Sequence, residues 1–196
     1  MGAIVTNNLT MKKRDTMNCW KSFNVSKDLG SVRLVIFSLL GMLCFFILFN
    51  LLFTETYTHL KVRLLNFGIM IICILLVLPI HKLLHCLPIW LTGRKARLSI
   101  EKASALPMIH CNIKGAVSKR IYMVATISPA IIGTILMIAM AYVTPSAINY
   151  FAVSGSINFG LSVSDFLYLS YLLSAPSHAI VEEDRDGCRI LIKQSV

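Results

Sequence analysis

Hydrophobic residues form four long, nearly uninterrupted stretches in this chain of 196 residues, at 32–53, 64–91, 121–143 and 147–175. An α-helix rises about 1.5 Å per residue, so each stretch is long enough to cross the roughly 30 Å hydrocarbon core of a bilayer. The pattern therefore predicts an all-α polytopic membrane protein with four transmembrane helices.

Shorter segments outside these stretches show the alternation of strands. Residues 97–101 and 108–113 alternate between apolar and polar positions, and 178–182 and 188–192 flank the turn-like run 184–187. A period of two is typical of β-structure, and a turn between two such runs favours a hairpin. We expect a small cytosolic β hairpin or sheet at the membrane surface.

The composition agrees with a membrane protein. Hydrophobic residues make up 56% of the chain and charged residues only 14%, whereas soluble domains are about a quarter charged. The formal net charge of +10 could suggest nucleic acid, but the Lys and Arg residues sit between the apolar stretches, where they would flank a membrane. The lipid bilayer is the expected partner, and no nucleic-acid partner is expected.

The distribution of basic residues orients the four predicted spans. Lys and Arg are concentrated before the first span and between the second and third, while 54–63 holds two and 144–146 holds none. Basic loops stay on the cytoplasmic side. Both termini and the long middle loop are therefore expected in the cytoplasm, with two short loops outside.

These assignments divide the chain into three parts. Residues 1–31 form a cytosolic N-terminal segment, in which Met17 is a candidate true start, and 32–175 form the membrane domain with its cytosolic loop 92–120. Residues 176–196 form a cytosolic tail that is too short for a core of its own.

The cysteines show no metal-binding or disulfide pattern. None of the six belongs to a CxxC pair, and three lie within apolar stretches. We therefore expect reduced or lipid-buried thiols, and neither a disulfide framework nor a zinc finger. The six are Cys19, Cys44, Cys73, Cys86, Cys111 and Cys188.

Two histidines near the inner end of the second span carry the clearest chemical signal. His81 and His85 are four residues apart, which places both imidazoles on one face of a helix. Two metal ligands of a zincin have this spacing. The pair is a candidate for two of the ligands of a zinc ion.

Asp165 is the candidate third ligand, because it is the only acidic residue inside any predicted span. His81 lies 17 residues past Leu64, and Asp165 lies 18 residues past Ala147. Since both spans enter from outside, both residues are expected about 25 Å into the membrane, toward the cytosolic face. Two imidazoles and a carboxylate can bind Zn²⁺ and leave a fourth position for water.

An alternative is that the histidines simply lie where a helix emerges into the interface, since polar residues gather at the ends of spans. Against this, two histidines, Lys82 and Asp165 fall in one narrow layer, and ionisable residues within spans are costly and usually functional. A shared site is the preferred interpretation.

Lys82 stands where the HExxH pattern has its glutamate, the residue that takes a proton from metal-bound water. Three readings remain open, in order of preference. Lys82 extends to the headgroups as an interfacial cation, it pairs with Asp165 in place of a metal, or it is a neutral base beside Zn²⁺.

Other ionisable residues are weaker candidates. His59 and His178 are expected to be solvated. His110, in the cytosolic loop, could supply a fourth ligand only if the loop folds back over the membrane face. The acidic run 182–186 could supply a carboxylate only by folding inward.

The order of elements resembles a family of small bacterial membrane proteins catalogued as "putative zincin peptidases". It comprises the His-Lys-Leu-Leu-His segment 81–85 at the end of an apolar helix, a basic loop, Ser128-Pro129 in the next span, and Asn158 seven residues before Asp165. The resemblance covers most of the chain, from about Met17 to Arg189, and implies a multi-pass protein of the bacterial cell membrane.

The resemblance implies that His81, His85 and Asp165 are the metal ligands, and it places a general base where Lys82 stands. The layout is also similar to that of site-2-type intramembrane proteases, in which an Asn near the third ligand helps hold the substrate or its oxyanion. Asn158 is therefore a candidate auxiliary residue. A helix-to-helix hydrogen bond is an equally good reading, because small residues surround Asn158 in the sequence.

The sequence thus predicts a membrane zinc metallopeptidase of zincin type, or a degenerate relative, that acts on a membrane protein or peptide. The alternative is a non-catalytic membrane interaction protein in which Lys82 replaces the general base. A small transporter is a third hypothesis, but four spans without paired broken helices give it little support.

Overall fold

The computed structural model describes residues 17–53, 66–94, 96–101, 108–113, 115–184 and 187–193. The segment before Met17, His59 and the side chain of His110 lie outside this description. Within it, the structure is mostly helical, with small antiparallel sheets.

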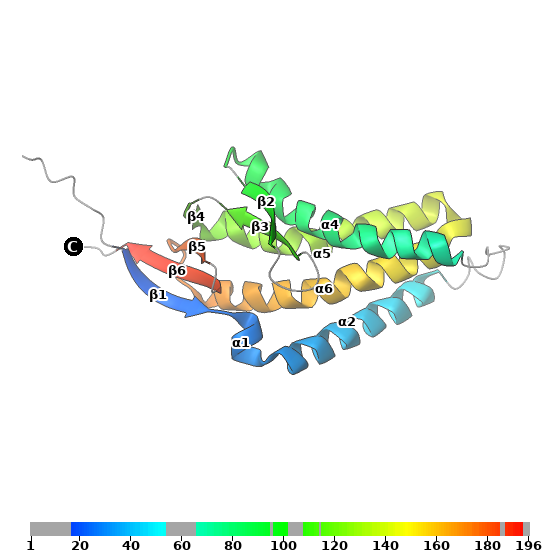
Figure 1. Cartoon of the computed structure of the whole chain (residues 1–196), viewed down its shortest axis with the longest axis horizontal. Coiled ribbons are helices and arrows are strands. Elements are labelled where there is room, and N and C mark those ends of the chain that lie inside the picture. The colour runs from blue at the N-terminus through cyan, green and yellow to red at the C-terminus, as the bar shows by residue number, and fades with distance from the viewer. Residues whose placement is uncertain are drawn as a thin grey trace, which may run out of the picture.

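Four long helices form the body of the protein: α2 (Ser31–Leu52), α4 (Phe67–Leu91), α5 (Lys119–Val143) and α6 (Ile148–Ser174). Their bounds agree with the four predicted apolar stretches to within three residues. Figure 1 shows that α2 and α5 run in one direction along the bundle and α4 and α6 in the other. This is the up-and-down order that the predicted topology requires.

Local signals set two of the helix ends. The Oδ1 of Asn66 accepts hydrogen bonds from the backbone N–H groups of Gly68 and Ile69, at 3.0 and 3.4 Å, and so caps the start of α4. At the same end of the bundle, α5 stops at Val143. Pro145 then begins the short 3-10 helix η1 (Pro145–Ala147), because proline fits a first helical position but cannot continue a helix.

Three helices in the described residues, α2, α4 and α5, are long and apolar enough to cross a membrane. The fourth long helix, α6, has 27 residues but is not among them. It packs against α2, α4 and α5, so many of its side chains face other helices and need not be apolar. Four spans therefore remain a prediction.

Small residues let α6 approach its neighbours closely. A Cβ built at Gly155 would lie 2.7 Å from Cε1 of Phe45 on α2, and one at Gly160 would overlap the side chain of Met42. Real Cβ atoms do not come this close, so a side chain at either position would force Phe45, Met42 or α2 itself to shift. This packing fixes the depth and rotation of α6.

The strands lie mainly at one end of the bundle. A four-stranded antiparallel sheet has the order β1 (Met17–Phe23), β6 (Gly187–Lys193), β5 (Ile180–Asp184), β4 (Val117–Ser118). Figure 1 places it at the end where α6 finishes. A separate hairpin pairs β2 (Ala96–Glu101) with β3 (Met108–Ile113).

The predicted strands are present, with β5 beginning two residues later than expected, but β1 and β4 were not predicted. β1 pairs with β6 at the far end of the sequence, and its register shifts between Cys19 and Lys21. That irregularity removes the simple alternation by which a strand is recognised. The N-terminal segment, the middle loop and the tail therefore share one sheet.

A hydrophobic core joins this sheet to the helix ends. Phe23, Val117 and Ile190 from the strands are buried together with Cys86 of α4 and Leu172 of α6. Burial of these side chains contributes roughly 1.5–3 kcal/mol each. The sheet therefore anchors the ends of α4 and α6 relative to each other.

The expectation of reduced or lipid-buried thiols is wrong for Cys86, which is disulfide-bonded. Cys19, Cys44, Cys73 and Cys188 form no disulfide, and the Sγ of Cys188 lies 3.0 Å from the hydroxyl of Tyr122. The absence of a CxxC spacing says nothing about two cysteines that the fold brings together, because a disulfide requires only closeness in space.

Replacement of Gly160 by alanine should destabilise the protein, because the added methyl group collides with Met42 and approaches the carbonyl oxygen of Ser38 to 3.0 Å. We expect a loss of about 1–3 kcal/mol, seen as a lower Tm in detergent. Ala139→Val, at an exposed position of α5, is the control and should change Tm little. Equal effects of the two changes would contradict close α2–α6 packing.

Candidate metal centre

The two histidines of α4 face α6. His81 and His85 lie one helical turn apart, with ring centroids separated by 5.0 Å and ring planes nearly perpendicular. The side chain of His81 is 2% exposed and that of His85 is 14% exposed. The pair is thus inside the bundle, with His85 on its more open side.

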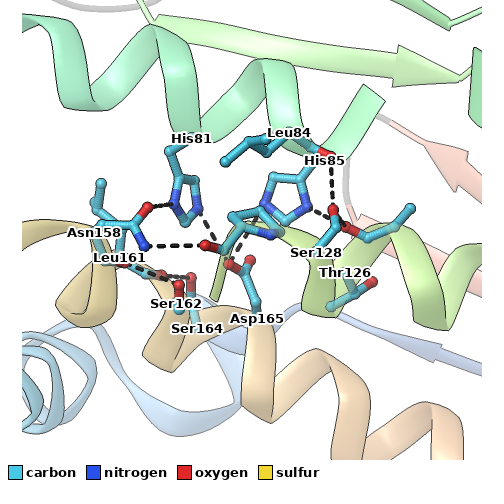
Figure 2. Close-up of polar contacts among 12 residues, drawn as sticks. His81, Leu84, His85, Thr126, Ser128, Asn158, Leu161, Ser162, Ser164 and Asp165 are labelled. Atoms are coloured by element: carbon cyan, nitrogen blue, oxygen red, sulfur yellow. Dashed lines mark hydrogen bonds and ion pairs between the residues drawn. The ribbon is translucent and has the colours of Figure 1, made fainter. Parts of the chain in front are cut away.

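Asp165 comes from α6 to meet both rings. Its Oδ2 atom lies 3.2 Å from Nε2 of His81 and 3.4 Å from Nε2 of His85, as Figure 2 shows. One ligand atom from each of the three residues falls within 4.8 Å of the others, so this group could hold a metal ion. The structure therefore brings together the three residues that the sequence singled out.

The other ring nitrogen of His81 is held by Asn158. Nδ1 of His81 is 3.0 Å from Oδ1 of Asn158, and Nδ2 of Asn158 donates to the carbonyl oxygen of Pro129 at 3.0 Å. A carbonyl oxygen can only accept, so it fixes the amide with its NH₂ toward Pro129 and its oxygen toward His81. Nδ1 of His81 must then carry a proton.

His85 is held in the same way by a backbone group. Its Nδ1 lies 2.8 Å from the carbonyl oxygen of Ala125 on α5. Nδ1 of His85 must therefore carry a proton. In a neutral imidazole with Nδ1 protonated, Nε2 has a free lone pair.

Both Nε2 lone pairs consequently point at the Asp165 carboxylate. Oδ2 of Asp165 is buried without a hydrogen-bond donor among the described residues, although both imidazoles are within ion-pair distance. Three electron-pair donors facing one another repel unless a cation lies among them. A metal ion fits this donor set, since metal-binding histidines usually donate their other N–H to a carbonyl or carboxylate group.

Lys82 does not take part in this cluster. It is half-buried on α4, and within the described part of the chain it forms no ion pair with Asp165. The reading in which Lys82 pairs with Asp165 in place of a metal is therefore wrong. The next residue along a helix is turned by about 100°, so Lys82 lies beside the face shared by the two histidines, at the position that the glutamate has in an HExxH pattern.

The remaining candidates lie elsewhere or have other partners. Asn158 is 3% exposed and uses both ends of its amide within the protein, which favours the helix-to-helix hydrogen bond over contact with a substrate. His178 is exposed after the end of α6, and Glu182 is exposed on β5.

Sequence reasoning missed the part that α5 plays in the site. The carbonyl oxygens of Ala125 and Pro129 orient the two histidines, and Ser128 joins α5 to the Leu84 carbonyl of α4 at 2.6 Å. Backbone groups have no sequence signature. The one available signal was Pro129 inside an apolar helix, because a proline leaves a carbonyl four residues earlier without its helical donor.

Comparison with protein families gives a match. The family model described as "Putative zincin peptidase" matches residues 74–180, which is more than half of the chain. The matched segment includes His81, His85, Asn158 and Asp165. No curated protein and no solved structure matches the chain significantly.

Zinc should stabilise the folded protein if it binds this cluster. With free zinc at about 1,000 times Kd, the expected gain in unfolding free energy is about 4 kcal/mol, visible as a higher Tm that a chelator reverses. Asp165→Asn keeps the shape but removes the carboxylate, and should abolish the gain. The control is Asp28→Asn, which makes the same charge change at an exposed position of α1 (Val25–Leu29). Equal stabilisation of both variants would place the binding elsewhere.

Proposed function

Because the chain belongs to the family described as "Putative zincin peptidase", we propose that it is a membrane zinc protein of the metallopeptidase class. His81, His85 and Asp165 hold the zinc ion. The observation that carries the proposal is the convergence of two Nε2 atoms on a buried carboxylate oxygen that has no hydrogen-bond donor in the described structure.

The donor set favours zinc over other ions. Two neutral imidazoles and one carboxylate are typical of catalytic zinc sites, which keep a fourth position for water or substrate. Mg²⁺ and Ca²⁺ prefer oxygen ligands, and no cysteine joins the cluster among the described residues. When bound in such a site, zinc polarises a carbonyl group and lowers the pKa of its water. The more exposed His85 side chain lies where a substrate could enter.

We place the site inside a membrane, near its cytosolic face. His81 is ten residues before the end of α4 and Asp165 nine residues before the end of α6, which puts both about 15 Å from the same end of the bundle. In this proposal α6 is the fourth span, and its polar residues are tolerated because they face α2, α4 and α5. The sheet and the basic residues Arg94 and Lys119 then lie in the cytoplasm.

Lys82 supports a second candidate function. A protonated amine cannot accept the proton that a peptidase must remove from water, and the cluster contains no second carboxylate among the described residues. A non-catalytic relative would keep the zinc site and bind a membrane protein or peptide without cleaving it.

Lys82→Glu separates the two functions, because it restores a carboxylate at the position of the general base. We expect zinc-dependent cleavage of fluorescent transmembrane peptides in proteoliposomes to rise about 10²-fold or more over the unmodified protein. Lys82→Gln removes the charge without adding a base and is the matched control. His85→Ala combined with Lys82→Glu should be inactive.

The outcomes have distinct meanings. Cleavage gained by Lys82→Glu alone supports a peptidase site disabled at one residue. Cleavage by the unmodified protein that His85→Ala abolishes supports a working peptidase with an unusual base. Zinc binding with no cleavage by any variant contradicts the peptidase proposal and favours the non-catalytic one.

A further inference from the structure

We propose that Pro129 is the positioning residue that holds both histidines of the zinc site in one tautomer. Among the described residues, Pro129 forms no hydrogen bond with either imidazole. It acts through two carbonyl oxygens of α5, its own and that of Ala125, each of which fixes one ring. The inference rests on the proposed function only in its prediction for metal affinity, since the tautomers belong to the metal-free protein as well.

Pro129 acts on His85 through the backbone carbonyl of Ala125, which proline leaves without its helical hydrogen-bond donor. In an α-helix the N–H of residue 129 would bond to the carbonyl of Ala125, but proline has no N–H. Ala125 is 4% exposed, so its carbonyl must find a donor inside the protein. Nδ1 of His85 supplies it at 2.8 Å. The Ser128 hydroxyl is 2.9 Å from the same oxygen, but its single proton has a closer acceptor in the carbonyl of Leu84, at 2.6 Å.

Pro129 acts on His81 through its own backbone carbonyl. This carbonyl accepts a hydrogen bond from Nδ2 of Asn158. The Oδ1 atom of the same amide is thereby turned toward Nδ1 of His81. Gly133 on the next turn of α5 makes room for this contact, because a Cβ there would lie 2.5 Å from Nδ2 of Asn158. The amide is thus clamped between α5 and His81.

Both sets of hydrogen bonds place a proton on Nδ1, one on His85 and the other on His81. With Nδ1 protonated on His81 and His85, both Nε2 lone pairs face Asp165 and are available to a metal ion. If either ring changed tautomer, its Nε2 would carry a proton and could not bind. Pro129 therefore affects both histidines of α4. The N–H that it lacks leaves the Ala125 carbonyl to His85, and its own carbonyl orients Asn158 toward His81.

The other prolines inside spanning helices show that this arrangement is specific. Pro88 frees the carbonyl of Leu84, which accepts a hydrogen bond from Ser128 at 2.6 Å and ties α4 to α5. Pro79 frees the carbonyl of Leu75, an exposed residue, and no described side chain donates to it. Pro79 therefore offers a control with the same chemistry at a site that holds no imidazole.

The test is Pro129→Ala, which restores an N–H that competes with His85 for the carbonyl of Ala125. In the metal-free protein with ¹⁵N-labelled histidine, at alkaline pH, NMR of the unmodified chain should show His81 and His85 protonated at Nδ1. In Pro129→Ala, His85 should become a mixture of tautomers, and zinc affinity should fall about 10- to 100-fold. The Tm of the metal-free variant should change little, because the hydrogen bond that α5 gains offsets the cavity left by the fully buried proline ring.

Two further variants complete the experiment. Asn158→Leu should release the tautomer of His81 and leave that of His85 unchanged. Pro79→Ala should leave both tautomers unchanged and zinc affinity within about twofold of the unmodified protein. An equal loss of affinity in Pro79→Ala and Pro129→Ala would overturn the proposal, because helix straightening alone would then explain it.

Failure of this inference is distinguishable from failure of the zinc site. If Pro129→Ala keeps both tautomers and full affinity, the positioning role is wrong while the metal site stands. If the unmodified protein binds no zinc, the proposed function fails. The NMR signals of the metal-free protein would still show whether Pro129 controls the rings.

Discussion

A carboxylate buried between two imidazole lone pairs is the constraint on which the rest of the structure depends. Among the described residues, Oδ2 of Asp165 has no hydrogen-bond donor. The Nδ1–H groups of both histidines already donate hydrogen bonds to carbonyl oxygens, those of the Asn158 side chain and of the Ala125 backbone. Such a group is costly in a low-dielectric interior unless a cation neutralises it. The arrangement is one that could hold a metal ion.

The packing of α6 against its neighbours brings the Asp165 carboxylate to the depth of the two histidines of α4. α6 carries polar residues that would be costly against lipid, and it is enclosed by α2, α4 and α5. Glycines at the contacts, Gly155 and Gly160 toward α2 and Gly133 toward α6, set how closely the helices approach. The sheet, built from three distant parts of the chain, holds the ends of α4 and α6 over a shared core.

The sequence was informative wherever a local period or spacing carried the signal. Four apolar stretches matched the four long helices, alternation located β3 and β6, and the spacing of His81 and His85 with the depth of Asp165 identified the residues that the fold brings together. β1 was not predicted, because it pairs with β6 at the far end of the sequence and its register is irregular. The orientation of the two imidazole rings was not predicted, because the backbone carbonyls of Ala125 and Pro129 set it, the second one through Asn158.

X-ray absorption at the zinc edge on the purified full-length protein tests the central claim most directly. The account predicts about one zinc per chain, with imidazole nitrogen and oxygen donors at about 2.0–2.1 Å, and loss of this signal in Asp165→Asn. Absence of zinc, or sulfur donors at about 2.3 Å, would contradict a site made by His81, His85 and Asp165.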